Sequence, residues 1–191
     1  MTRFCLIRHG QTEWNLAGRY QGQSDVPLNE KGRAQARALA WQFRKLPFAA
    51  VYSSDLQRAR ETAEIIAAAL HLPVTADIRL REINQGEWEG QLVETIAARY
   101  AALWRQRQVD PAGIRPPGGE TVEEVARRAR AALQDISRLH PDDSILISSH
   151  GLTLATVICQ DRHVPIGRAY SLIPENATPV WVEWKANGPA A

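Results

Sequence analysis

The chain has 191 residues, of which 45% are hydrophobic, and this length and composition suit a single globular domain over residues 1–191. Its 23 Lys and Arg residues almost balance its 21 Asp and Glu residues, leaving a formal net charge of +2. Nothing therefore points to nucleic acid or an acidic membrane surface as a partner.

The first half of the chain alternates short apolar runs with helical segments. Buried strands are predicted by the apolar runs 3–7, 49–54 and 73–76. The polar, glycine-rich segment 10–28 predicts a loop or a broken helix. Helices are expected over 29–46, with Asn29 as the N-cap, and over 55–70, with Asp55 at the start.

The second half begins with segments that lack a clean period. Loops are predicted at 79–91 and 109–120, on either side of a helix over 92–108. Thr121 and Glu124 have capping-box spacing at the start of a helix over 121–139. The remaining elements are a strand, a buried helix and an alternating edge strand, at residues 144–149, 150–160 and 179–185.

This alternation of strands and helices predicts an α/β fold with a largely parallel central sheet. We expect a three-layer α/β/α arrangement in which the alternating strand near the C-terminus lies antiparallel at an edge. In such sheets ligands bind beyond the carboxyl ends of the strands. The place to look for function is therefore where each parallel strand ends.

Two strands end in the same way, in "FCLIRHG" and in "ILISSHG". Both run from an apolar strand into a His-Gly pair, at His9 and His150. If the two strands are neighbours, both imidazoles face one pocket. In an extended strand Arg8 and His9 point to opposite sides, so both reach one site only if the chain turns, which Gly10 would permit. A neighbouring guanidinium would keep His9 neutral and therefore nucleophilic.

Further candidates follow the second strand and the third. Arg58 lies one turn into the helix after the strand at 49–54, near the carboxyl edge of the sheet, while Arg60 faces elsewhere. The loop "LREINQGEWEG" offers three acids, Glu82, Glu87 and Glu89, as proton donors. Spacing alone does not choose among them.

Other kinds of site are not supported. The chain contains neither G-x-x-x-x-G-K-[ST] nor G-x-G-x-x-G, and its five histidines have no metal-binding spacing, so we expect no metal and no cofactor. Cys5 and Cys159 lie in apolar surroundings without a C-x-x-C pair and are interpreted as buried free thiols of a cytoplasmic protein. No stretch has the length of a membrane span.

The segment "LIRHGQTEWN" resembles the signature of the histidine phosphatase superfamily, the phosphoglycerate-mutase-like proteins. The resemblance extends, in the family's order, through "RYQGQSDVPLNEKGRAQA", "VYSSDLQRARETAEIIA", "LREINQGEWEG", "PPGGET" and "SSHG". These blocks cover most of the chain. A lone R-H-G would be weak evidence, but the blocks together are specific.

The resemblance implies roles for the matching residues. His9 would be the nucleophile that becomes a phosphohistidine, and Glu82 would be the proton donor. Phosphoryl oxygens would be held by Arg8, Arg58 and His150, and we expect His150 to act in its protonated form. Substrate contacts are implied, on the same resemblance, for Asn15, Gln21, Gly22 and Gly151.

The resemblance therefore implies a metal-independent phosphatase acting on small phosphate monoesters. A 2,3-bisphosphoglycerate-dependent phosphoglycerate mutase shares the catalytic residues, and a non-catalytic phosphate-binding module is a further alternative. Family mutases are typically longer between the acid and the second histidine. Here the compact 82–150 interval favours the short phosphatase branch. The identity of the monoester stays open. The edge strand 179–185 would let two copies pair as a homodimer.

Overall fold

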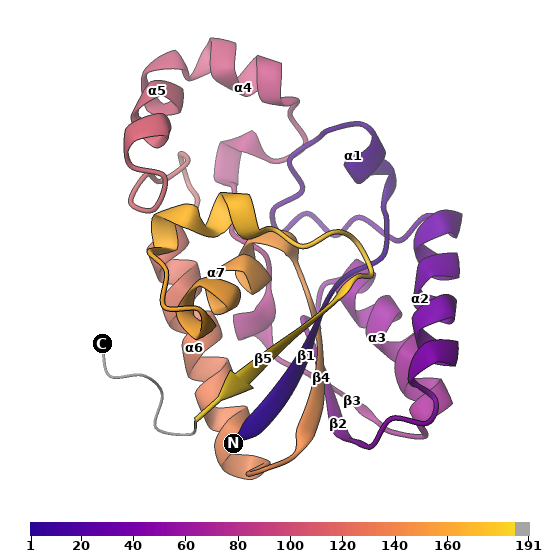
Figure 1. Ribbon diagram of the computed structural model, residues 1–191. Coiled ribbons are helices and arrows are strands. Elements are labelled where there is room, and N and C mark those ends of the chain that lie inside the picture. Colours follow the sequence, from indigo (N-terminus) through magenta and orange to yellow (C-terminus); the bar gives the residue numbers. More distant parts are fainter. Residues whose placement is uncertain (186–191) are drawn as a thin grey trace.

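The computed structural model describes residues 1–185. A five-stranded sheet in the order β3-β2-β4-β1-β5 forms the centre of the molecule (Figure 1). Its strands are β1 (Thr2–Arg8), β2 (Phe48–Ser53), β3 (Val74–Ala76), β4 (Ser144–Ser149) and β5 (Pro179–Trp184). All neighbouring pairs are parallel except β1 and β5, which confirms the predicted mostly parallel sheet with an antiparallel edge strand.

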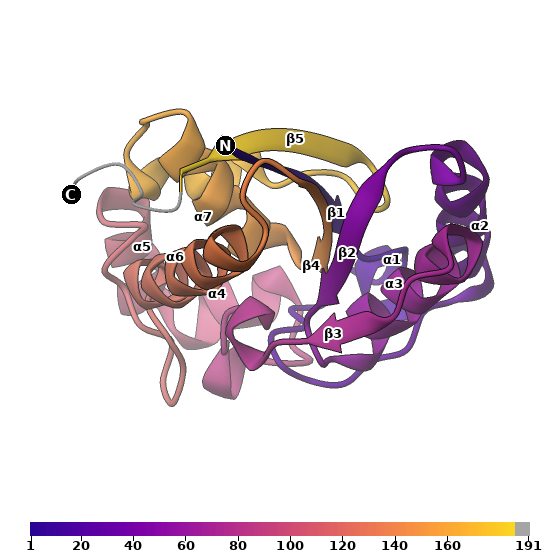
Figure 2. The same cartoon turned by 90° about the horizontal axis from the view of Figure 1, so that it is seen from below.

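Helices cover both faces of this sheet (Figures 1 and 2). One face carries α2 (Glu30–Phe43) and α3 (Gln57–Leu70), and the other carries α6 (Val122–Leu139) and α7 (Gly151–Asp161). The short helices α1 (Glu13–Leu16), α4 (Val93–Arg99) and α5 (Ala101–Val109) lie beyond the carboxyl ends of the parallel strands. Three 3₁₀ helices complete the set, namely η1 (Ile78–Leu80), η2 (Gly86–Trp88) and η3 (Ile166–Leu172).

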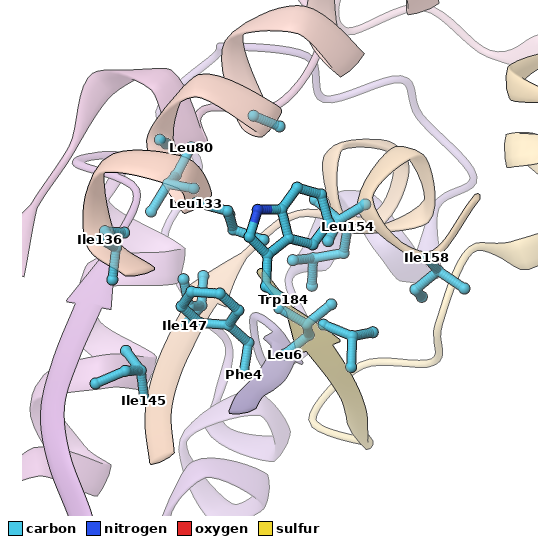
Figure 3. Packing of buried hydrophobic residues seen from close by; sticks show 14 residues of the cluster. Phe4, Leu6, Leu80, Leu133, Ile136, Ile145, Ile147, Leu154, Ile158 and Trp184 are labelled. Carbon is cyan, nitrogen blue, oxygen red and sulfur yellow. The ribbon is translucent and has the colours of Figure 1, made fainter. Parts of the chain in front are cut away.

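The central strand β1 is apolar on both sides because it is covered on both sides. Phe4 and Leu6 belong to the cluster under α6 and α7, where Leu133 and Leu154 are also fully buried (Figure 3). Cys5, in the other direction, belongs to the cluster under α2 and α3. Full burial of one such leucine stabilises the fold by about 1.5–3 kcal/mol. The two clusters hold β1 and β4 side by side at the centre of the sheet.

Local sequence signals set the starts of α2 and α6. Asn29 caps α2 by accepting a hydrogen bond from the Gly32 N–H, and Thr121 forms the predicted capping box with Glu124 at the start of α6. Both predicted free cysteines, Cys5 and Cys159, are buried and unbridged.

The expectation that Asp55 starts α3 is wrong. The helix begins at Gln57, whose N–H donates 2.7 Å to the carboxylate of Asp25 from a distant loop. The Asp55 carboxylate instead accepts two hydrogen bonds from the Arg81 guanidinium, at 2.8 and 2.5 Å. The Asp55 carboxylate therefore forms a bidentate ion pair with Arg81 and does not lie at the start of α3.

The helix expected over 92–108 is broken in two. Tyr100, with φ −116° and ψ 40°, separates α4 from α5. Its ring packs 6.1 Å from the ring of Trp88, and its hydroxyl donates 2.7 Å to the Glu87 carboxylate. These long-range contacts accompany the break, and they hold the α4–α5 segment over the loop that carries Glu82.

Candidate active site

His9 directly follows β1 and continues its pairing with β4. The Arg8 position lies opposite Ser149, and the His9 N–H donates 2.9 Å to the Ser149 carbonyl. The carbonyl of His9 accepts 2.8 Å from the side-chain amide of Asn176. The His9 side chain is 3% exposed. The sheet therefore holds the His9 N–H, and the Asn176 side chain holds the His9 carbonyl.

The contacts of the His9 ring determine its tautomer. Nδ1 lies 2.7 Å from the Gly10 carbonyl, which can only accept, so Nδ1 carries the hydrogen and Nε2 carries the lone pair. Arg58 Nε donates to Nε2 at 3.2 Å. Burial, together with the cations Arg58 and Arg8, holds the pKa of His9 well below its ordinary value. His9 is therefore a neutral imidazole whose nucleophilic nitrogen faces guanidinium groups.

Gly10 is needed for close packing rather than for an unusual backbone. It is absent from the glycines with positive φ, and a Cβ on it would lie 2.5 Å from the Gly32 carbonyl oxygen. The Gly10 backbone thus rests directly on the first turn of α2. Arg8 and His9 both line one cavity, as predicted. Gly10 contributes by allowing the backbone after His9 to lie directly against α2.

Arg58 is a completely buried cation on the first turn of α3. Besides contacting His9, it donates 2.8 Å to the carbonyls of Ser24 and Gly22. Burial lowers its pKa to about 10, so it remains charged at neutral pH. Arg60 points away and pairs with Glu64 on the exposed helix face, as its spacing predicts.

Arg8 forms a second guanidinium wall beside His9. Its Nη1 donates 3.0 Å to the Pro174 carbonyl, and its buried Nε has no hydrogen-bond partner among residues 1–185. A Cβ on Gly151 would lie 3.4 Å from the Arg8 guanidinium carbon and 2.9 Å from Ile173. Because Gly151 has no side chain, the Arg8 guanidinium has room beside it.

His150 follows β4 and lies behind the cavity wall. Its ring centroid is 5.2 Å from that of His9, so the two strand-end imidazoles are neighbours, but only His9 lines the cavity that both were expected to face. Its Nε2 lies 2.8 Å from the Ser54 hydroxyl, and its Nδ1 has no partner among the described residues. Burial and the nearby cation Arg58 hold the pKa of His150 well below its ordinary value. The expected protonated form is therefore not that of the free protein, and a neutral His150 donates from one nitrogen only.

The structure distinguishes the three acids that spacing could not. Glu82 is the one that lines the cavity with His9. Glu87 is exposed and bonded to Tyr100, while Glu89 accepts hydrogen bonds from the backbone of Gln23 and the hydroxyl of Ser24. The proton donor position implied for Glu82 is thus the one that geometry allows.

The Glu82 carboxylate lies at the start of α7. It accepts hydrogen bonds from the backbone N–H groups of Leu152 and Thr153, each at 3.1 Å, and from the Thr153 hydroxyl at 3.2 Å. Unpaired N–H groups at a helix start favour a negative charge, so this position suits a carboxylate.

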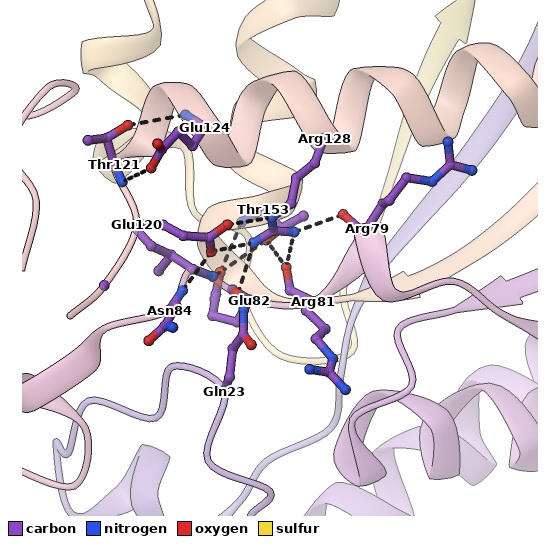
Figure 4. Close-up of polar contacts among 12 residues, drawn as sticks. Gln23, Arg79, Arg81, Glu82, Asn84, Glu120, Thr121, Glu124, Arg128 and Thr153 are labelled. Carbon is purple, nitrogen blue, oxygen red and sulfur yellow. Dashed lines mark hydrogen bonds and ion pairs between the residues drawn. The ribbon is translucent and has the colours of Figure 1, made fainter.

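Arg128 on α6 holds the backbone of the Glu82 segment (Figure 4). Its guanidinium donates to the carbonyls of Arg79, Arg81 and Glu82 at 2.6–2.9 Å. It also forms a two-pronged pair with Glu120, whose carboxylate accepts from the Asn84 N–H. Arg128 is a positioning residue that sequence reasoning missed, because its partners are carbonyls 46–49 positions away.

The loop after His9 forms another wall of the cavity. Asn15 and Gln21 are linked through Thr12, whose hydroxyl lies 3.1 Å from each of their side-chain oxygens. Gly22 has φ +51°, and a Cβ there would collide with the Glu89 carboxylate. Asn15, Gln21 and Gly22 all line the cavity, as the resemblance implies.

The resulting cavity measures about 190 Å³. This is below the roughly 300–1,000 Å³ of sites for drug-sized ligands, so it suits a small group such as a phosphate ester. All nine predicted site residues border it except His150, which backs His9. The lining residues that sequence reasoning missed are Arg19, Tyr20, Ile83, Gln85, Arg107, Leu152, Tyr170 and Ile173. Trp14, Trp88 and Trp104 do not line this cavity.

Residues 1–185 contain no group of three or more His, Cys, Asp or Glu side chains placed to hold a metal ion. Over the same range, no helix is long and apolar enough to cross a membrane.

Comparisons with known proteins were made at the level of sequence and fold. A family model described as histidine phosphatase superfamily (branch 1) matches residues 4–191. Phosphoserine phosphatase 1 of Hydrogenobacter thermophilus is 33% identical over 178 residues, which are 93% of this chain and 84% of that protein. The probable phosphoglycerate mutase GpmB of Serratia proteamaculans is 42% identical over 159 residues, or 83% and 74% of the two chains.

Among solved structures, a mycobacterial glucosyl-3-phosphoglycerate phosphatase complexed with VO3 has the same fold. Its TM-score is 0.83 at 32% sequence identity, and the match covers 94% of this chain and 90% of that chain. The sequence similarity thus extends over nearly the whole chain, and so does the match in fold.

Proposed function

The chain belongs to the histidine phosphatase superfamily (branch 1), and on that premise we propose that it is a metal-independent phosphatase. It hydrolyses small phosphate monoesters through a phosphohistidine at His9. The observation that carries this proposal is the His9 ring, whose Nδ1 donates to the Gly10 carbonyl while Nε2 accepts a hydrogen bond from Arg58, with Arg8 as a second nearby cation. A neutral nucleophile flanked by fixed cations suits attack on a phosphate dianion.

In the first step the Nε2 lone pair attacks phosphorus, and the ester P–O bond breaks in line with the new N–P bond. Arg8 and Arg58 neutralise the phosphoryl oxygens, and Arg58 exchanges its contact with Nε2 for one with an oxygen. Glu82 gives its proton to the departing alkoxide. Glu82 therefore enters this step as the carboxylic acid.

In the second step Glu82, now a carboxylate, takes a proton from water. The resulting hydroxide attacks phosphorus, the P–N bond breaks, and its electron pair returns to Nε2. Inorganic phosphate leaves, and Glu82 is protonated again. Hydrogen bonds to the start of α7 stabilise the carboxylate between the two steps.

The test is release of phosphate from p-nitrophenyl phosphate in the presence of EDTA. We expect undiminished turnover, together with acid-labile, base-stable labelling of the protein when a labelled ester is quenched in mid-reaction. Failure of the folded protein to turn over either this ester or a panel of metabolite esters would contradict the phosphatase. Full loss of activity in EDTA would contradict the metal-independent mechanism.

A phosphoglycerate mutase is the second candidate, because relatives at 42% identity carry that name. The two reactions diverge only in what accepts the phosphoryl group from His9. Incubation of 3-phosphoglycerate with and without 2,3-bisphosphoglycerate separates them. A phosphatase releases inorganic phosphate, whereas a mutase forms 2-phosphoglycerate only when the bisphosphate is present.

We further propose that the chain acts as one domain in the cytoplasm on a free phosphorylated metabolite, without nucleic acid or membrane as a partner. The open edge of β5 lets two copies pair as a homodimer. Sedimentation of the purified chain tests this last point.

A further inference from the structure

Arg107 on α5 is a partly buried cation surrounded by aromatic rings. Its guanidinium carbon lies 4.2 Å from the ring centre of Tyr170 and 4.9 Å from that of Trp104. It lies 5.7 and 5.9 Å from the ring centres of Tyr20 and Trp88. Its Nη1 donates 2.7 Å to the Tyr20 hydroxyl. Within residues 1–185, no carboxylate forms an ion pair with Arg107.

Arg107 also stands between two cavities. Together with Tyr20 and Tyr170 it lines both the cavity that contains His9 and an outer cavity of about 350 Å³. The outer cavity is bordered further by residues of α5 and η3, including Trp104 and Arg168. A leaving group that extends away from His9 into the outer cavity would pass the Arg107 guanidinium.

The charges of the inner cavity indicate what that leaving group carries. Four arginines line the cavity, at positions 8, 19, 58 and 107, against the single carboxylate of Glu82. A phosphate dianion next to His9 accounts for Arg8 and Arg58. Arg107 lines the inner cavity at a wall that it shares with the outer cavity. The phosphate that is paired with Arg8 and Arg58 therefore does not neutralise the positive charge of Arg107.

Arg128 provides a contrast, because its guanidinium is fully paired. Arg128 donates to three backbone carbonyls and pairs with Glu120. Arg107 has one hydroxyl acceptor for its five N–H donors, apart from its contacts with Tyr170. A guanidinium fork with free donors at a cavity wall is suited to a two-pronged contact with an oxyanion.

We propose that Arg107 is the specificity-determining residue of this enzyme and binds a second anionic group, a carboxylate or a further phosphate, on the leaving group of the substrate. Tyr20 and Tyr170 hold its guanidinium in place. The inference rests on the proposed phosphatase function, because it assigns the substrate class to the same cavity.

The experiment compares matched esters that differ only in the second charge. 3-Phosphoglycerate and glycerol 3-phosphate share a skeleton in which a carboxylate replaces a hydroxymethyl group. Glucose 1,6-bisphosphate and glucose 6-phosphate form the pair for a second phosphate. We expect kcat/KM to favour the more anionic member of at least one pair by roughly 10- to 100-fold, the range for hydrogen bonds to a charged group.

Variants then assign this preference to Arg107. Arg107→Met should bring the ratio within a pair close to one, and Arg107→Lys should restore part of it, because the charge remains but the fork is lost. Arg105→Met is the matched control. Arg105 lies on the same helix and is exposed, so this variant should keep the wild-type ratio.

Binding measurements separate this inference from the proposed function. Titration calorimetry of the same pairs into a His9→Ala protein, with and without Arg107→Met, requires no turnover. Discrimination that depends on Arg107 supports the inference even if no ester is hydrolysed, in which case the proposed function alone fails. The inference is overturned if the wild type is active but discriminates within neither pair, or if Arg107→Met and Arg107→Lys both keep the wild-type ratio.

Discussion

The two ends of the cavity are built in different ways. At the inner end, His9 and His150 come directly off neighbouring strands, Arg58 comes off a helix start beside them, and all three side chains are buried. At the outer end, Arg107 and Tyr170 come from the short segments α5 and η3 and are held through ring contacts. At the inner end the hydrogen bonds of the sheet fix the backbone beside His9, whereas at the outer end the Arg107 guanidinium is held by aromatic side chains.

This difference matches two separate tasks, namely attack on phosphorus and selection of the leaving group. Attack on phosphorus needs atoms placed within fractions of an ångström, and a sheet edge supplies that precision. Choice of leaving group needs only a complementary wall, which a surface segment supplies and which can change without disturbing the sheet. We therefore expect variants at the inner end to lower the rate for every ester, and variants at the outer end to change which ester is preferred.

The largest expected effect is that of His9→Ala. Loss of Nε2 should reduce turnover of every ester to the uncatalysed level and abolish acid-labile labelling. His71→Asn is the control, because His71 is an exposed helix C-cap with φ 56°, a conformation that asparagine tolerates. Assays of both proteins with p-nitrophenyl phosphate and with an alkyl phosphate provide the measurement. Substantial activity in His9→Ala would refute the nucleophile assignment.

Glu82→Gln comes next and tests the general acid. We expect kcat to fall by about 10²–10⁴ for alkyl phosphates, whose leaving oxygen needs a proton. The loss should be smaller for p-nitrophenyl phosphate, because p-nitrophenolate leaves without one. Glu87→Gln, in the same loop but exposed and bonded to Tyr100, should change neither rate by more than about twofold. Equal losses for both leaving groups in Glu82→Gln would count against the acid role.

Arg128→Met tests how the inner end is supported from behind. Removing the guanidinium leaves the Glu120 carboxylate and three carbonyls without their donor, which should lower the free energy of unfolding by about 1.5–3 kcal/mol. If Arg128 also positions Glu82, the variant should lose more activity with alkyl phosphates than with p-nitrophenyl phosphate. Urea unfolding and the two assays provide the readouts. The exposed Arg127→Met is the control for α6, and a uniform loss in Arg128→Met would mean a structural role only.

The neutral histidines give the inner end a pH-dependent stability. Burial and nearby cations lower the pKa of His9 and His150 in the folded chain, whereas the unfolded chain protonates them near pH 6.5. The unfolded state therefore binds more protons below that pH, and stability is lost as the pH falls. The slope should not exceed about 1.4 kcal/mol per pH unit for each histidine. Urea unfolding at pH 7.5, 6.5 and 5.5 should show a shallower decline in His9→Gln than in the wild type.

The smallest expected effect is at the outer end. Tyr100→Phe removes only the hydrogen bond to the exposed Glu87 carboxylate, which water replaces. We expect little change in the urea midpoint of unfolding and a change of less than twofold in kcat/KM. A large loss of activity would mean that the outer end is as tightly coupled to the chemistry as the inner end, and the contrast would fail.

The inner end could be predicted from the sequence because its signals are local. Apolar runs, the repeated His-Gly pair and an arginine one turn into a helix place His9, His150 and Arg58 at one sheet edge. The choice of Glu82 over its neighbours came from the family resemblance, and the cavity lining now gives it a geometric reason.

The outer end could not be predicted in this way. Arg107 occupies an ordinary position in a helix, and its aromatic partners come from segments that carry no periodic signal of contact. The helix start expected at Asp55 was wrong for a related reason, since the partner of Asp55, Arg81, is 26 positions away. Long-range pairing of this kind has no signature in a single sequence, even when every element around it is recognised.

The contact between the His9 Nδ1 and the Gly10 carbonyl has a consequence for regiochemistry. An imidazole offers two sites for phosphorylation, and free histidine yields a mixture of positional isomers. In the proposed mechanism the Gly10 carbonyl keeps the hydrogen on Nδ1, so we expect a single covalent intermediate, phosphorylated at Nε2. A backbone oxygen of a glycine thereby decides which of two chemically similar nitrogens carries the phosphoryl group.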